Sequence, residues 1–311
     1  MRYHSFSICL ALFLFTIFCA GCATVKVTES SVRRAPQWVF GAEHNFLIVS
    51  AEAEDIETAK NKALNEVKKQ MVNAISENIR TTSHTTTEEL GVDDAYATVE
   101  LYREELATES GNVPFLSQVT LANVTDYYWE KRYDKKTKAE WYVYHLKYPF
   151  SRLNQDELIA KFEAQEAAIN RQLKELEQVD FSTFSSVEQM VAQGTALRTF
   201  QSTLMENDGR RKACDRILRG YKSNVEQLTI QAVSVDREKT LYEVYLGEKK
   251  MACNIRPYLR SKCLEQMNWQ VKDGVNVVTY DYSECFEDEQ NYIDITITVM
   301  GKKINHRYFI L

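Results

Sequence analysis

The sequence predicts an α+β protein built from three consecutive regions: a strand-helix-strand-strand domain, a helical hairpin or bundle, and an immunoglobulin-like β-sandwich. The main observation is a change of hydrophobic period, from mixed before residue 150, to three and four until 227, to two until the end. Only 10 Gly and 4 Pro interrupt the 311 residues, so long elements are expected. A chain that is 44% hydrophobic and 26% charged is globular, which excludes disordered, collagen and coiled-coil classes.

The N-terminus predicts where the protein resides. Residues 1–21 hold an apolar run of roughly 14 residues, shorter than the ~20 that a spanning helix needs, and we interpret them as a lipoprotein signal peptide. Small residues, Ala20 and Gly21, precede Cys22, whose thiol can carry diacylglycerol. We therefore predict a mature chain that begins at an acylated, palmitate-bearing Cys22 and is anchored in the outer membrane on its periplasmic face, with plain secretion as the alternative.

Residues 22–35 are small and polar, a composition that predicts a flexible tether between the lipid and the first domain. The net charge of −6 gives no electrostatic reason to expect a nucleic-acid partner.

Cysteine usage follows from export. Two of the seven cysteines would leave with the signal and Cys22 would be lipidated, so four remain: Cys214, Cys253, Cys263 and Cys285. An oxidising compartment permits disulfides, and Cys263 with Cys285 is the preferred bridge because both lie beside neighbouring predicted strands. Four buried thiols are the alternative.

The first domain is expected over residues 36–150. A buried strand is predicted over 45–53, followed by a helix with Asp55 at its N-cap and an apolar stripe from Ile56 to Ile75. One or two short helices are expected within 88–108. Strands over 119–133 and 139–149 then flank a polar turn and form a β-hairpin.

The remaining chain divides at about residue 227. Residues 151–227 predict three amphipathic helices, the first two with capping boxes at Asn154 with Glu157 and at Ser185 with Glu188. Residues 228–311 predict six or seven strands, with Trp269 as a core anchor and a type I′ hairpin turn at Asp273-Gly274. The expected strands are 228–235, 241–246, 267–271, 275–282, 292–300 and 304–310.

Motifs of catalysis are absent from the sequence. It contains no nucleophile elbow, no zinc-protease motif, no phosphate-binding loop and no dinucleotide fingerprint. The histidines of the mature chain are scattered, and the acidic cluster Glu284, Glu287, Asp288 and Glu289 lacks calcium-loop spacing. We expect a non-enzymatic protein without cofactor or metal.

Aromatic residues concentrate in the predicted hairpin. Alternation along its strands sends them to both faces, so rings on the face away from the helix need a second cover. Packing of the rings on each other is one interpretation, and contact with a partner or ligand is the other. The candidate ligand or partner residues are Tyr128, Trp129, Trp141, Tyr142 and Tyr144.

The first domain resembles the LPP-twenty lipoprotein family over about residues 36–150. The resemblance lies in the lipobox, Pro36-Gln37-Trp38-Val39, the strand ending Ala51-Glu52-Ala53, and the small residues Ala59 and Ala63 on the helix. Related domains occur in flagellar outer-membrane and ring-assembly proteins. The resemblance implies a role in envelope assembly or adhesion, with no catalytic residues.

These observations predict a non-enzymatic envelope lipoprotein that acts in cell-envelope assembly or protein–protein interaction. The alternative is a ligand-binding lipoprotein that stacks a glycan or flat small molecule on the aromatic hairpin. A membrane contact through the N-terminal lipid and an envelope protein partner are expected, and nucleic acid is not.

Overall fold

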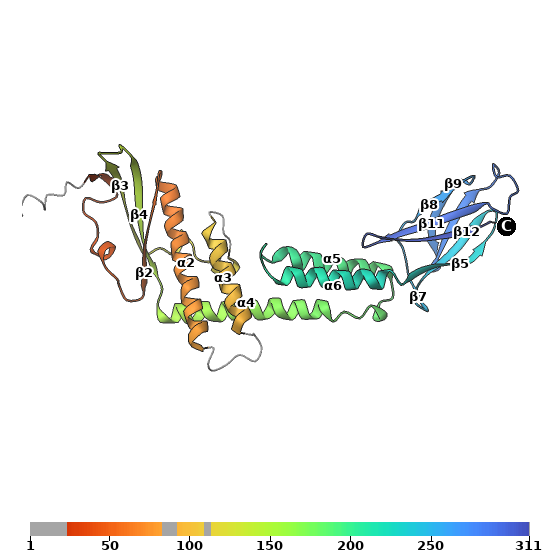
Figure 1. Cartoon of the computed structure of the whole chain (residues 1–311), viewed down its shortest axis with the longest axis horizontal. Coiled ribbons are helices and arrows are strands. Elements are labelled where there is room, and N and C mark those ends of the chain that lie inside the picture. The colour runs from red at the N-terminus through yellow and green to blue at the C-terminus, as the bar shows by residue number, and fades with distance from the viewer. Residues whose placement is uncertain (1–23, 83–91, 109–112, 311) are drawn as a thin grey trace, which may run out of the picture. The chain divides into compact units, whose positions relative to one another are not determined.

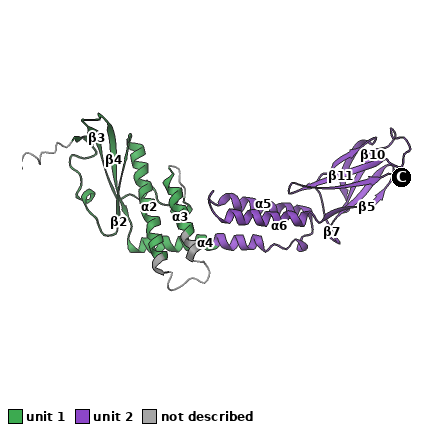
Figure 2. Cartoon of the chain, in the orientation of Figure 1, with its two compact units in different colours: residues 1–167 green, residues 168–311 purple. Residues whose placement is uncertain are grey.

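A computed structural model describes residues 24–82, 92–108 and 113–310, which form two compact units, residues 1–167 and 168–311 (Figure 2). The α+β class is confirmed, with helices and antiparallel sheets in one chain. The signal peptide and Cys22 lie outside the described residues.

A four-stranded antiparallel sheet forms the centre of unit 1 (Figure 1). The strand order is β1-β3-β4-β2. The strands are β1 (Val25–Ser30), β2 (Phe46–Ala53), β3 (Asp126–Asp134) and β4 (Glu140–Pro149). Helix α2 (Ile56–Thr82) packs on β2 and β4, and α3 (Val92–Ala107) packs beside α2. Ala59, Ala63 and Val67 of α2 are fully buried, as the predicted stripe requires.

The N-terminal part of this sheet corrects one expectation. Residues 22–35 were predicted to be a flexible tether, whereas Val25–Ser30 forms the edge strand β1 and pairs antiparallel with β3. Two alternating valines in six residues are too weak a local signal for a strand. Backbone hydrogen bonds with β3 stabilise the strand. The hydrophobic pattern of residues 22–35 by itself could not indicate those bonds, because they join distant parts of the chain.

The segment after β1 crosses to the opposite edge of the sheet, where β2 begins. A 3₁₀ turn, Gln37–Phe40, lies on this path, and the indole of Trp38 is buried and donates to the Asp126 carboxylate at 2.8 Å. The predicted strand over 119–133 begins only at Asp126, because a second 3₁₀ turn, Leu121–Asn123, is capped by Thr120. Another 3₁₀ turn, Pro114–Leu116, precedes it.

The three helices predicted between 151 and 227 are present. The N-cap of the first lies three residues before the predicted position, and that of the second lies one residue after it. They are α4 (Arg152–Glu177), α5 (Val187–Thr203) and α6 (Arg210–Val225). The cap of α4 is Ser151, which exchanges hydrogen bonds with Asn154, and that of α5 is Ser186 with Gln189. In each observed capping box a serine is followed three residues later by Asn or Gln. The predicted capping boxes had a glutamate at that third position instead.

Two antiparallel sheets form the β-rich part of unit 2. One has the order β5-β6-β10-β9 with β7 paired to β6, and the other has the order β12-β11-β8. The first contains β5 (Leu228–Val235), β6 (Lys239–Leu246), β7 (Lys249–Met251), β9 (Glu265–Lys272) and β10 (Val275–Asp281). The second contains β8 (Tyr258–Ser261), β11 (Tyr292–Val299) and β12 (Lys302–Phe309).

All six predicted strands of this region occur, and β7 and β8 were missed because three and four residues are too few for a period to show. Asp273 and Gly274 both have positive φ, 53° and 75°, as a type I′ turn needs. Trp269 packs against the core but is only partly buried.

One continuous core joins the helices and sheets of unit 2. It includes Val187 and Leu197 of α5, Ile217 of α6, Val244 of β6 and Ile295 of β11. A phenolic hydrogen bond adds to it, since Tyr221 of α6 donates to the Leu176 carbonyl.

The boundary between the two units lies at residues 167/168, inside α4. The sequence predicted boundaries at 150/151 and 227/228 instead.

Among the described residues, no helix combines the length and the apolar character that crossing a bilayer requires.

Candidate functional site

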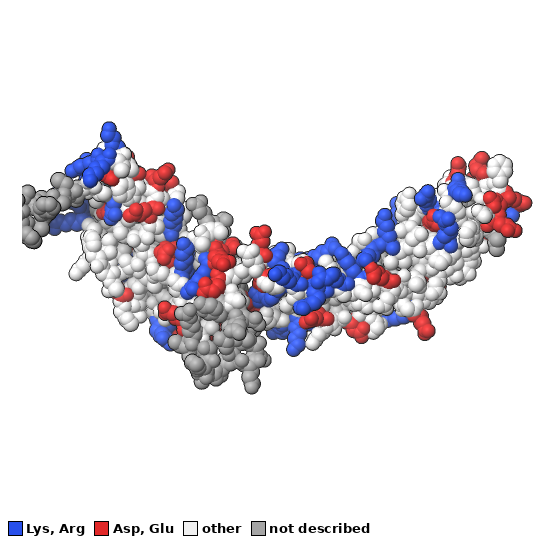
Figure 3. All heavy atoms as spheres, viewed as in Figure 1, with Lys and Arg blue, Asp and Glu red and all other residues white. Residues whose placement is uncertain are grey.

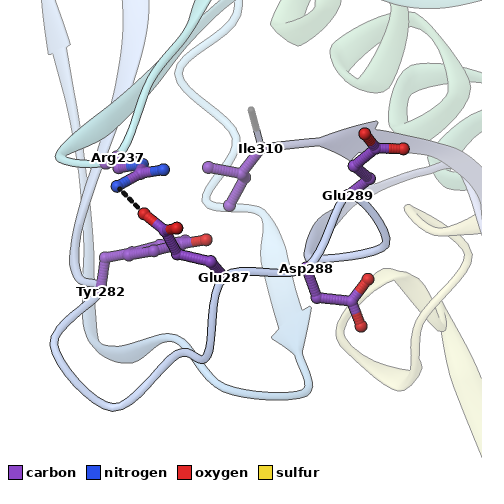
Figure 4. Close-up of a pocket in the computed structure, with 6 residues that line it drawn as sticks. All are labelled: Arg237, Tyr282, Glu287, Asp288, Glu289 and Ile310. Atoms are coloured by element: carbon purple, nitrogen blue, oxygen red, sulfur yellow. Dashed lines mark hydrogen bonds and ion pairs between the residues drawn. The ribbon is translucent and has the colours of Figure 1, made fainter.

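A small pocket lies at the rim of the unit 2 sheets (Figure 4). Its volume is about 270 Å³, slightly below the roughly 300–1,000 Å³ of small-molecule pockets. Four of its six lining residues are charged, so it suits a polar or charged side chain better than an apolar ligand. The lining residues are Arg237, Tyr282, Glu287, Asp288, Glu289 and Ile310.

The loop that forms one wall, residues 282–291, is held at both ends. Cys285 is joined to Cys263 by a disulfide, the pair preferred from the sequence, while Cys214 and Cys253 are buried thiols. Asn291 is buried, and its amide donates to the Tyr282 hydroxyl at 2.8 Å and to the Phe286 carbonyl at 2.7 Å. These bonds give the loop a defined shape.

The charges of the pocket are unbalanced. Arg237 pairs with Glu287 at 3.1 Å and lies over the Tyr282 ring, with 5.5 Å from guanidinium to ring centre. Across the described part of the chain, no cation comes within ion-pair distance of Asp288 or Glu289. The mouth of the pocket is therefore acidic, and its surplus negative charge favours a cationic group.

Phe286 lies in the middle of this acidic loop with 91% of its surface exposed. The sequence singled out the four acidic residues, without calcium-loop spacing, and did not single out the phenylalanine. The available signal was an aromatic residue in a charged segment next to a disulfide cysteine. Together, an exposed ring and an acidic pocket mouth form what we call the acidic loop surface, residues 284–289.

The aromatic hairpin carries the other predicted site residues. Paired residues share a face, so the register places Trp129, Tyr142 and Tyr144 on the face with α2, and Tyr128 and Trp141 on the opposite face. Tyr144 is 6% exposed and stacks on Tyr127, which is 53% exposed, with ring centres 5.8 Å apart. Burial raises the pKa of Tyr144 to about 12.

A packed polar cluster occupies the face away from α2. Tyr128 is 4% exposed and donates to Glu130 at 2.9 Å, and Glu130 also accepts from Arg132 at 2.6 Å. His145 stacks on Tyr128 at 5.6 Å, and burial lowers the pKa of His145 while the nearby Glu130 carboxylate opposes that shift. Burial also raises the pKa of Tyr128.

The hairpin does not bring its five candidate rings together. Tyr128 and Tyr144 are buried on opposite faces, and Trp129, Trp141 and Tyr142 are partly buried. The indole nitrogen of Trp141 and Nε2 of His145 are buried and have no hydrogen-bond partner among the residues that the structure describes. Most of this aromatic content therefore packs within unit 1.

Helix α6 carries a further charged surface. Its exposed face holds Lys212, Arg216 and Arg219. In the described ranges, no group of three or more histidine, cysteine, aspartate or glutamate residues is arranged to hold a metal ion.

The comparisons with known proteins give no relative. No family model, no curated protein and no solved structure matches the chain.

Proposed function

We propose that the chain is a non-enzymatic lipoprotein of the bacterial envelope, anchored through Cys22, that binds a protein partner through the acidic loop surface of unit 2. The resemblance of residues 36–150 to the LPP-twenty family supports a role in envelope assembly. The two sheets of unit 2 share one core, and we interpret them as an immunoglobulin-like sandwich, a common fold of binding modules.

One observation carries the proposed partner contact: Phe286 is almost fully exposed on a loop that is covalently and hydrogen-bond restrained. A ring held in water by a restrained backbone loses little conformational entropy when a partner covers it. Aromatic anchors surrounded by polar residues are typical of binding hot spots. The acidic neighbours favour a partner with basic residues around an apolar pocket.

The test is site-specific photocrosslinking in cells. A photoreactive phenylalanine analogue at position 286 should give a discrete crosslinked species with one envelope protein. The same analogue at Val233, an exposed apolar residue of β5, is the matched control. Identical crosslinks from both positions, or none from 286, would contradict the proposal.

Anchoring is tested separately. The Cys22→Ser chain should move from the membrane fraction to the soluble envelope fraction, and the wild-type N-terminal peptide should carry the mass of a diacylglycerol and an added acyl chain. An unmodified Cys22 in the wild-type protein would contradict the anchor and leave the partner surface to be judged by crosslinking.

Stacking of a glycan or flat molecule on the hairpin is the second candidate. Two buried nitrogens favour it, the indole nitrogen of Trp141 and Nε2 of His145, which no described residue pairs, because a ligand with several hydroxyl groups would satisfy them. A change of tryptophan fluorescence on titration with cell-wall glycan fragments, lost in Trp141→Phe, would support this candidate.

A further inference from the structure

Pairing of β1 brings the start of the described chain to the tip of the aromatic hairpin. The carbonyl of Thr24 accepts a hydrogen bond from the backbone amide of Lys135 at 3.0 Å, and Val25 lies opposite Asp134 in the β1–β3 register. Figure 1 shows the described chain beginning beside the end of β3 and β4. The turn between these strands is therefore adjacent to the residues that follow Cys22.

This turn is basic. Lys135, Lys136 and Lys138 are all exposed, and in the described part of the chain no carboxylate lies within ion-pair distance of them. Figure 3 shows basic side chains gathered where the described chain begins. We call these three residues the lysine turn.

The acidic groups nearest the lysine turn are already engaged. The Asp134 carboxylate accepts the backbone N–H of Lys136 at 2.8 Å, and this bond lowers the pKa of Asp134. Glu140 pairs with Lys131 at 2.8 Å. Lys26, over the Tyr133 ring, adds a further positive charge from β1. The tip of the hairpin therefore presents an excess of positive charge to whatever it faces.

Covalent geometry limits how far this charge can lie from the lipid. Cys22 precedes Thr24 by two residues, and two residues of fully extended chain span at most about 7 Å. That span is no longer than the screening length of about 8 Å at physiological salt. If acyl chains on Cys22 insert in a bilayer, the lysine turn lies within electrostatic reach of the headgroup phosphates.

We propose that the lysine turn binds the anionic headgroups of phospholipids, as a second membrane contact that sets the orientation of the unit 1 sheet on the bilayer. The proposal rests on the lipid anchor of the proposed function. A lipid combined with a basic cluster is a known physical route to stable membrane attachment. Here the hairpin brings the basic cluster to the anchor from more than a hundred residues away in the sequence.

Lysine labelling of the lipidated full-length protein tests the contact. The protein is inserted into vesicles of phosphatidylethanolamine, with or without phosphatidylglycerol, and acetylated briefly. Mass spectrometry should show severalfold slower labelling of Lys135, Lys136 and Lys138 on anionic vesicles, restored by high salt. Lys272, an exposed lysine of β9, should label at the same rate on both. Equal labelling of the turn on both vesicles would overturn the proposal.

Measuring how the unlipidated chain partitions between water and vesicles tests the lysine turn without the acyl chains. The full mature chain with Cys22→Ser should bind anionic vesicles weakly, and Lys135→Gln, Lys136→Gln and Lys138→Gln together should weaken that binding by about tenfold or more. The matched control removes three positive charges from α6, as Lys212→Gln, Arg216→Gln and Arg219→Gln. An equal loss in both triple variants would show an unspecific effect of net charge and overturn the proposal.

Failure of the anchor and failure of the lysine turn give different results. A wild-type N-terminal peptide without acyl mass contradicts the anchor, whatever the vesicles show. An acylated protein whose lysine turn labels equally on both vesicles contradicts the lysine turn alone. Both triple variants should keep the wild-type melting temperature, because exposed surface cations contribute little to stability.

Discussion

The lysine turn of unit 1 and the acidic loop surface of unit 2 have opposite charges and a similar local sequence character. Both are exposed, charged connections near the end of a strand, and each by itself is typical of a solvated turn. Their neighbours distinguish them. The lysine turn lies beside Thr24, and the acidic loop surface surrounds Phe286 and adjoins a pocket. The comparison teaches that a charged turn acquires a partner through what the fold places next to it.

The two units also differ in what holds them together. In unit 1, aromatic rings and a polar cluster fill both faces of one sheet, with Tyr128, Tyr144 and Tyr148 buried. In unit 2, aliphatic residues of β11, Ile293, Ile295 and Ile297, are fully buried and a disulfide restrains the rim. Unit 1 should therefore respond to loss of rings and to pH, and unit 2 to reduction.

The largest expected effect is on unit 1. Tyr144→Ala removes a buried ring between α2 and the sheet, and should lower the free energy of unfolding of unit 1 by about 3 to 4 kcal/mol. Tyr127→Ala, which removes the exposed partner of the same stack, should cost less than about 1 kcal/mol. Denaturant titration followed by tryptophan fluorescence measures both. Similar losses from the two variants would contradict the assignment of Tyr144 to the core.

Reduction tests unit 2. Cys263→Ser with Cys285→Ser opens a loop of 22 residues and should lower the free energy of unfolding of unit 2 by about 3 kcal/mol. The reason is the larger conformational entropy of the unfolded chain. Hydrogen exchange resolved by peptide should show the change in β8 to β12 and none in β1 to β4. Faster exchange across unit 1 would contradict the division into two units.

The smallest expected effect is a dependence on pH confined to unit 1. Burial lowers the pKa of His145 below its ordinary value of 6.5, so the unfolded chain binds a proton that the folded chain does not. Stability contributed by the neutral imidazole is present above pH 6.5 and is lost as the pH falls from there towards the lowered pKa. Unfolding curves of the wild-type protein and His145→Gln between about pH 7.5 and 5.5 measure this. An unchanged slope in the variant would remove His145 as its source.

Much of the fold was predictable because its signals are local. The apolar stripe of α2, the caps of the helices to within a turn, and the glycine of the Asp273-Gly274 hairpin each depend on neighbours in the sequence. The choice of Cys263 and Cys285 followed from the same pattern, since both were expected on neighbouring strands. β1 was not predictable, because an edge strand depends on backbone bonds to residues about a hundred positions away.

The candidate sites divide in the same way. The sequence indicated Cys22 as the lipidation residue, and it showed the acidic cluster and the dense aromatic hairpin. It could not separate Tyr144 from Tyr127, because burial of a ring depends on which face of the sheet α2 covers. It could not single out Phe286 either, because exposure is a property of the packed surface.

By itself the sequence determined the α+β class, the order of helices and strands, and the expectation of export and lipidation, since periodicity, caps and the lipobox are encoded in adjacent residues. Only the tertiary structure decided that residues 25–30 join the sheet, that α5 and α6 share a core with the strands of unit 2, and that the lysine turn lies beside Thr24. Strand pairing and burial depend on contacts between distant segments, and such contacts exist only after the chain has folded.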